Sequence, residues 1–94
     1  MNVRYYIDPQ TGLPHICNHN VAEYEVEDVL TNPGEDRPGR DGSRVAIGHT
    51  SNGRLLRVIY LPDPEPKSAF VVTAYELRGK PAFTYRRRRR KIHP

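Results

Sequence analysis

The sequence predicts one small α+β domain, in which an antiparallel sheet of three to four strands carries one or two helices on one face. The chain has 94 residues, which is enough for one domain and too few for two. Two late segments alternate in polarity with the period of a strand, a third is apolar on both faces as a central strand is, and one earlier segment has the spacing of a helix. The linkers between the late segments are short, so they fit hairpins rather than crossover connections.

The first half of the chain predicts one strand and then the clearest helix. Residues 3–7 are β-prone and are followed by a segment rich in turn residues. Asn20 is a favourable N-cap, and Glu23 lies three residues later, which is the spacing of a capping box. A stripe of apolar residues follows at helical spacing, and Pro33 ends the helix.

Three further strands are expected at Ser43–His49, Arg54–Leu61 and Ala69–Leu77. The Asn52-Gly53 pair between the first two is a strong hairpin signal. Residues 35–42 show no periodicity and are expected to form a loop, and the proline-rich residues 62–66 cannot pair within a sheet.

The end of the chain carries all of its excess positive charge. The net charge is +4, yet six of the 15 lysines and arginines lie at residues 86–91, which leaves nine against 11 acidic residues elsewhere. We therefore divide the chain into an α+β domain at residues 1–85 and a basic tail at residues 86–94. Guanidinium groups bind phosphate bidentately, so the tail is expected to bind RNA, another polyanion or an acidic partner. A solvated, disordered terminus is the simpler alternative. The nucleic-acid-binding candidates are Arg54, Arg86, Arg87, Arg88, Arg89, Arg90 and Lys91.

Composition and motifs exclude several classes of protein. No segment has the apolar length of a membrane span, so a cytoplasmic protein is expected. Cys17 is the single cysteine, which rules out an intramolecular disulfide. His15 and His19 flank it, but three ligands so close in sequence need a fourth elsewhere, and we expect no metal or other cofactor. The phosphate-binding loop, the nucleophile elbow, H-E-x-x-H and paired catalytic carboxylates are all missing from the sequence.

A histidine and an arginine flank the expected hairpin turn. His49 ends one strand and Arg54 begins the next, so both are expected within reach of one phosphate. A histidine can move a proton near neutral pH, and an arginine can stabilise the charge of a phosphorane. The spacing alone favours the alternative, a half-exposed strand residue beside a turn cation. Tyr75 at a strand end and Tyr85 beside the arginines offer rings on which unpaired bases can stack.

Several motifs, taken in order, resemble those of BrnT toxins, which belong with the RelE-like ribonucleases of type II toxin–antitoxin systems. The resemblance extends from His19 to Arg86. The motifs that carry it are His19-Asn20-Val21, the acidic helix up to Asn32-Pro33, Gly48-His49-Thr50, the run from Gly53 to Tyr60, Val71-Val72-Thr73-Ala74-Tyr75 and Tyr85-Arg86.

This resemblance implies a small antiparallel sheet flanked by helices, and a metal-independent ribonuclease that a bound antitoxin holds inactive. Transferred by position, it implies a set of catalytic candidates, to which the hairpin reasoning adds His49. The implied residues are His19, Arg54, Thr73, Tyr75 and Tyr85. The chain has Tyr75 where the family has an arginine, so the tail has to supply that cation. It also has Asn18 in place of a lysine and Asn20 in place of a glycine.

Two functions of different classes remain open. The first is a toxin-type endoribonuclease, in which the ribose 2′-OH attacks its own 3′-phosphate. His49, His19 or Tyr75 takes the proton, and Arg54 together with tail arginines stabilises the phosphorane. Its expected partners are RNA and an antitoxin protein. The second is a non-catalytic module whose basic tail binds RNA, DNA or an acidic partner.

Overall fold

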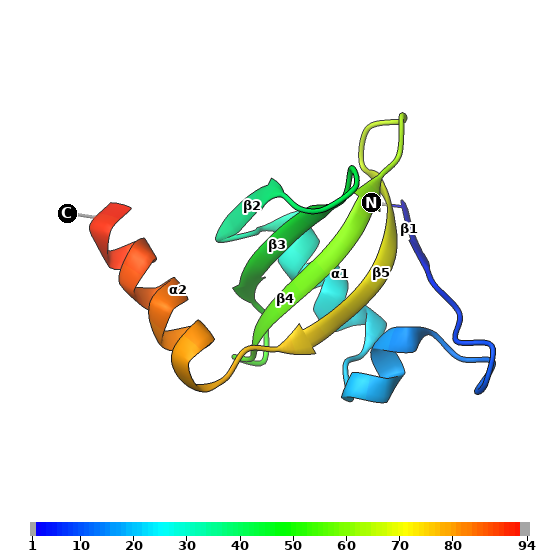
Figure 1. Cartoon of the computed structure of the whole chain (residues 1–94), viewed down its shortest axis with the longest axis horizontal. Coiled ribbons are helices and arrows are strands. Elements are labelled where there is room, and N and C mark those ends of the chain that lie inside the picture. The colour runs from blue at the N-terminus through cyan, green and yellow to red at the C-terminus, as the bar shows by residue number, and fades with distance from the viewer. Residues whose placement is uncertain (1, 93–94) are drawn as a thin grey trace.

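A five-stranded sheet forms the centre of the molecule (Figure 1). The computed structural model describes residues 2–92, and side chains as far as residue 90. In chain order the elements are β1 (Asn2–Tyr5), the 3₁₀ helix η1 (His15–His19), α1 (Glu23–Thr31), β2 (Glu35–Pro38), β3 (Arg44–His49), β4 (Leu55–Pro62), β5 (Ser68–Glu76) and α2 (Gly79–Ile92). The strands lie side by side in the order β1-β5-β4-β3-β2.

The α+β class is confirmed, but the sheet has five strands instead of three to four and is mixed instead of antiparallel. β1 pairs parallel with β5, while the other three pairings are antiparallel. The long stretch of chain between β1 and β5 permits the parallel pairing, which a short linker would forbid. β2 comes from residues expected to form a loop. It is a short edge strand, where Pro38 is tolerated because one side of the strand has no partner.

The helix α1 begins later than its sequence signals predict. Asn20 does not cap it but ends η1, in a left-handed conformation with a φ of 58°. Ala22 precedes the first turn, and its backbone N–H donates to the Glu25 carboxylate at 3.0 Å. The capping carboxylate is therefore Glu25 rather than Glu23, and this choice buries an acidic group beneath the helix start.

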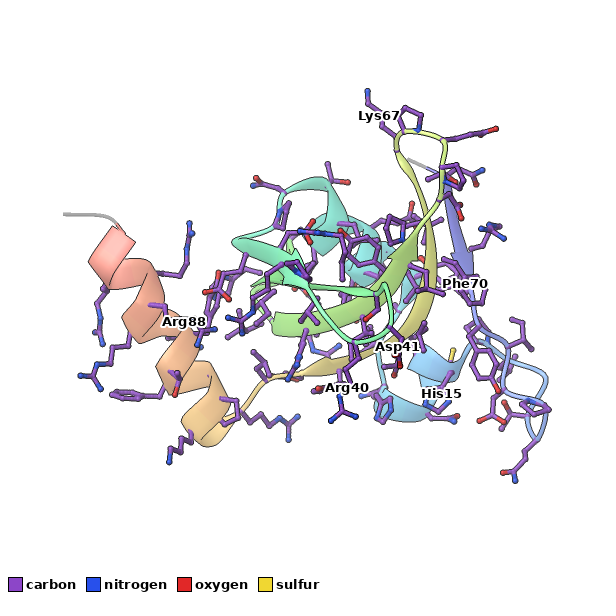
Figure 2. All side chains as sticks on the ribbon, turned by 45° about the horizontal axis from the view of Figure 1, so that its top comes forward. His15, Arg40, Asp41, Lys67, Phe70 and Arg88 are labelled. Carbon is purple, nitrogen blue, oxygen red and sulfur yellow. The ribbon has the colours of Figure 1, made fainter. Side chains whose placement is uncertain are left out.

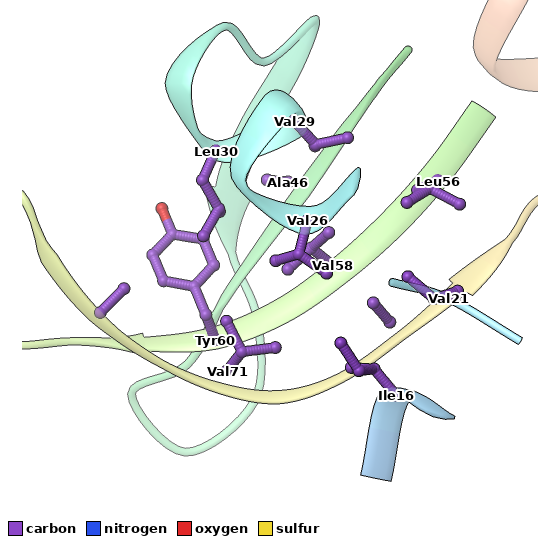
Figure 3. Close-up of a cluster of buried hydrophobic side chains, with 12 residues drawn as sticks. Ile16, Val21, Val26, Val29, Leu30, Ala46, Leu56, Val58, Tyr60 and Val71 are labelled. Carbon is purple, nitrogen blue, oxygen red and sulfur yellow. The ribbon is translucent and has the colours of Figure 1, made fainter. Parts of the chain in front are cut away.

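The main core lies between α1 and one face of the sheet (Figure 3). Val26 and Val29 of α1 are completely buried and pack with Leu56 and Val58 of β4. The whole cluster consists of Ile16, Val21, Val26, Val29, Leu30, Ala46, Leu56, Val58, Tyr60, Ala69, Val71 and Ala74. The side chains of β3 and β4 that alternate with these point to the opposite face, and this opposite face meets α2.

The basic end of the chain is a helix, α2, that packs on the second face of the sheet. Its Ala82 and Tyr85 are buried in a smaller cluster with Val45, Ile47, Leu55 and Leu77. The two α-helices thus lie on opposite faces of the sheet. The sequence-based expectation that the helices share one face is wrong. Pro81 is compatible with the first turn of α2, where the backbone N–H groups have no helical acceptor. The expected boundary between residues 85 and 86 falls inside this continuous helix. Across residues 2–92, neither α-helix combines the length and the apolar character that crossing a membrane requires.

The contact between Gly34 and Tyr85 gives a first prediction, because a methyl group at Gly34 would overlap the Tyr85 hydroxyl and crowd the Ile47 carbonyl. Overpacking of this kind costs about 1–3 kcal/mol, so Gly34→Ala should lower the free energy of unfolding by that amount in urea denaturation. Adding Tyr85→Phe should recover part of the loss, since it removes the overlapping oxygen, and Tyr85→Phe alone is the control. A Gly34→Ala protein as stable as the wild type would mean that α2 does not pack against this glycine.

Candidate functional site

Two of the five consecutive arginines fasten α2 to the segment that joins α1 to β2. Arg88 donates from Nε and Nη2 to the two carboxylate oxygens of Glu35, at 2.7 and 2.9 Å. Arg89 donates from Nη1 to the Gly34 carbonyl at 2.7 Å. The hydrogen bonds from Arg88 lower the pKa of the Glu35 carboxyl, so the pair is fully ionised at neutral pH. Figure 2 shows Arg88 on α2.

These contacts enclose a cleft of about 590 Å³ between α2, the α1–β2 connection and the end of β3. The cleft is lined by Asn32, Pro33, Gly34, His49, Tyr85, Arg86, Arg89 and Arg90. It contains three guanidinium groups and no carboxylate. A site of this composition attracts anions, and arginine pairs with phosphate oxygens in a bidentate manner.

His49 supplies the group of the cleft that can transfer a proton. Its side chain is exposed, and the centre of its ring lies 6.4 Å from the centre of the Tyr85 ring. Imidazole can accept and return a proton close to neutral pH. Burial raises the pKa of Tyr85, so its hydroxyl is a neutral hydrogen-bond donor at neutral pH and not a base. Arg86 and Arg90 are exposed and form no ion pair with a described side chain.

Arg54 does not belong to this cleft. It donates from Nη1 to the Glu25 carboxylate at 2.7 Å and to the Asn20 carbonyl at 3.0 Å. Its Nε donates to Glu76 at 3.1 Å. Burial alone would raise the pKa of Glu25, but hydrogen bonds from Ala22 and Arg54 outweigh this effect and lower it. The Arg54 guanidinium is therefore occupied by two carboxylates that belong to the fold.

The alternation of side chains along the hairpin explains why His49 and Arg54 lie apart. His49 pairs with Leu55, so these two residues share the face on which α2 packs. Arg54 is one residue earlier and therefore points to the α1 face, beside Glu25. The sequence-based expectation that both flank one hairpin mouth and reach the same phosphate is wrong for this reason.

Three other candidates lie away from the cleft, on η1 and on the part of β5 that follows its pairing with β1. The His19 ring is 5.3 Å from the His15 ring and 6.0 Å from the Tyr75 ring, measured between centroids. Thr73 has a buried hydroxyl oxygen with no hydrogen-bond partner among the described residues. His19, Thr73 and Tyr75 thus group around η1 and β5, while His49 and Tyr85 line the cleft.

The remaining tail candidates differ in their surroundings. Arg87 is exposed and does not line the cleft. Lys91 lies in α2, but its side chain is outside the described part of the structure. Within residues 2–92, no three His, Cys, Asp or Glu side chains come together in a way that could hold a metal ion, and this includes the H-x-C-x-H segment.

The cleft also contains residues that the sequence marks as a helix end and as part of a motif, but not as candidate site residues. Asn32, Pro33 and Gly34 form one wall of it. The predicted helix end at these residues is confirmed, because α1 ends at Thr31. Nothing in the local sequence could reveal that a helix more than fifty residues later packs beside them. The Arg88–Glu35 ion pair makes this contact, at the residue that follows Gly34.

Residues 16–76 match the family DUF4258, which is described as a domain of unknown function. The match covers more than half of the chain, so the protein belongs to this family. No curated protein and no solved structure matches the chain. The matched segment includes His49 and the Asn32-Pro33-Gly34 wall of the cleft, while α2 follows it in the sequence.

The ion pairs of Arg54 give a second prediction. Arg54→Met should lower the free energy of unfolding by about 3 kcal/mol, since it leaves the buried Glu25 carboxylate without its cation. Adding Glu25→Gln should recover part of this loss, because the unpaired charge is then removed. Both variants are compared by urea denaturation at neutral pH. An Arg54→Met protein with wild-type stability would show that the guanidinium is available for a ligand after all.

Proposed function

We propose that the protein is a metal-independent endoribonuclease of the RelE-like, BrnT-like toxin type, and that it acts in the cleft beside α2. One observation carries the proposal. A histidine and three arginines line a single cleft that contains no carboxylate. Proton transfer and phosphate stabilisation are the two tasks that cleavage of RNA by its own 2′-OH requires.

The proposed reaction is an internal transfer at one phosphodiester. The 2′-oxygen bonds to the adjacent phosphorus while His49 takes the hydroxyl proton, and the bond from phosphorus to the 5′-oxygen breaks. The His49 imidazolium then returns the proton to the departing 5′-oxygen. The products are a 2′,3′-cyclic phosphate and a 5′-hydroxyl, so no water or metal is consumed in this step.

The arginines of α2 have distinct tasks in this scheme. Arg86 and Arg90 are exposed at the cleft, so they are suited to the non-bridging phosphate oxygens. Arg89 is positioned by its hydrogen bond to the Gly34 carbonyl, and it contributes charge to the cleft wall. Burial raises the pKa of Tyr85 and keeps it a neutral phenol, so it does not act as a base. His19, Thr73 and Tyr75 are not assigned to this site.

The toxin assignment rests on the ordered motifs and on the arrangement of the core. The antiparallel β3–β4–β5 meander with α1 on one face agrees with the small sheet flanked by helices that the resemblance implies. The proposed partners are RNA as substrate and an antitoxin protein that keeps the enzyme inactive, and the proposed compartment is the cytoplasm.

The second candidate function is a non-catalytic module that binds RNA, DNA or an acidic partner. It is favoured by Arg54, because this candidate for transition-state stabilisation is already bound to Glu25 and Glu76. In this case the exposed arginines of α2 provide affinity, and His49 has no chemical task.

The proposal predicts that binding and cleavage can be separated by substitution. His49→Ala should slow cleavage of a single-stranded RNA by at least about 100-fold and leave its affinity nearly unchanged. Arg86→Gln with Arg90→Gln should weaken binding and reduce the slope of log affinity against log salt by about 1.4. Gel analysis of cleavage products and fluorescence anisotropy measure the two effects. Arg4→Gln is the matched control, since Arg4 is an exposed arginine paired with Asp63 outside the cleft.

Two outcomes would contradict the ribonuclease proposal. If expression of the wild-type protein neither arrests growth nor degrades RNA, the toxin assignment is wrong. If purified protein binds RNA with the predicted salt dependence but leaves it intact, the non-catalytic module is the correct function.

A further inference from the structure

A second basic groove lies on the sheet face that α2 covers in part. It consists of two hollows of about 300 and 530 Å³ that share Arg37 and Arg57. The first hollow continues to Lys80 and Arg88 of α2, and the second continues to Arg40 in the β2–β3 loop. Neither hollow is lined by an aspartate or a glutamate. Arg40 and Arg88 are both labelled in Figure 2.

Arg57, in the floor of the groove, is a partly buried cation without a counter-charge. Three other partly buried arginines are neutralised, as Arg44 pairs with Asp36, Arg54 with Glu25 and Arg88 with Glu35. No ion pair of Arg57 occurs among the described residues, and its buried Nε–H has no hydrogen-bond acceptor there. Such a group destabilises a fold unless an anion compensates it.

The second buried polar atom without a partner is on the same face. The Thr73 hydroxyl oxygen is buried and unsatisfied among the described side chains, and Thr73 pairs with Ile59, which lines the groove. Arg57 itself pairs with Tyr75, so a hydroxyl, a guanidinium and an aromatic ring share this part of the sheet. Buried polar atoms without partners are rare in folded proteins, and a bound water, ion or ligand is a usual explanation for them.

We infer that the groove binds the phosphodiester backbone of a single RNA strand, at a distance from the bond that is cut. This inference rests on the proposed function and names the form of its substrate. A peptide carboxylate could also neutralise Arg57 alone. The cations, however, extend through both hollows from Arg40 to Lys80, which suits an RNA strand with one negative charge per nucleotide. The partly exposed Ile59 lines the second hollow beside Arg57 and offers apolar surface to an unpaired base.

The groove and the His49 cleft lie on two sides of α2. Thr84 and Arg88 contribute to the groove, while Arg86 and Arg90 contribute to the cleft. A strand that occupies both sites passes α2, so an oligonucleotide must exceed a minimal length to use them together. Length dependence of affinity therefore separates this inference from simple attraction to the arginine run.

The test compares 2′-O-methyl oligonucleotides of about four and about 12 nucleotides, lengths that fall within the usual site sizes of single-strand binders. The methyl group blocks cleavage, so only binding is measured. The wild type should bind the longer strand at least about tenfold more tightly in fluorescence anisotropy. Arg57→Met and Arg37→Gln should each reduce this advantage severalfold and lower the salt slope by about 0.7 per cation removed. Arg4→Gln should retain the advantage.

Thermal unfolding provides a readout that a merely structural arginine would move in the opposite direction. Arg57→Met removes an unsatisfied donor and an unpaired charge. Its melting temperature should therefore be no lower than that of the wild type, and up to about 4 °C higher. A loss of binding together with unfolding at lower temperature would show that Arg57 only supports the fold, and would overturn the inference.

Other results also overturn it. These are equal affinity for the two lengths, no binding of either, unchanged binding by both variants, or stronger competition by a glutamate-rich peptide than by RNA. The His49→Ala cleavage assay is independent of these measurements. If affinity depends on length but His49→Ala does not slow cleavage, the inference about the groove is supported and the proposed cleavage site is wrong.

Discussion

The docking of α2 on the Gly34-Glu35 connection is the contact on which the candidate site depends. Tyr85 is buried where Gly34 leaves space for it, Arg88 holds the Glu35 carboxylate with two hydrogen bonds, and Arg89 reaches the Gly34 carbonyl. Charge-assisted bidentate pairs are the stronger kind of surface contact and also fix orientation. Because the helix turns by about 100° per residue, fastening residues 85, 88 and 89 directs Arg86 and Arg90 toward the neighbouring cleft.

Six of the twelve arginines fall into two groups with different surroundings. Arg44, Arg54 and Arg88 are paired with carboxylates and hold elements of the fold together. Arg57, Arg86 and Arg90 have no ion pair with described side chains and line the cleft or the groove. The excess positive charge of the chain therefore collects around α2, and two concave surfaces on either side of it present cations without acids.

The periodicity of the sequence predicts the hairpin and its neighbours well, because local side-chain alternation decides them. Residues 43–61 form two strands with the turn at Asn52-Gly53, and Gly53 has the positive φ of 87° that such a turn requires. The same alternation, followed one residue further, also places Arg54 on the face opposite His49. That consequence was available from the sequence, and the joint site of these two residues could have been rejected there.

The rest of the fold depends on contacts between distant segments, which local patterns do not encode. β2 is polar and lacks alternation, and its pairing with β3 forms a strand from residues 35–38. β1 pairs in parallel with β5, and the long connection between them permits this pairing. The helical state of the arginine run depends on Ala82 and Tyr85 finding a cluster made by β3, β4 and Leu77. Five adjacent arginines repel one another, so packing and the Glu35 pair have to stabilise that helix.

The most direct test of this account locates bound RNA on the folded protein by NMR. The probe is a short 2′-O-methyl oligonucleotide, which cannot be cleaved, added to isotope-labelled wild-type protein. The account predicts the largest shift changes at the His49 ring, the Gly34 amide and the Arg86 and Arg90 guanidinium groups, which line the cleft together. Shift changes centred on Arg54, His19 or Tyr75, with the cleft unaffected, would contradict it.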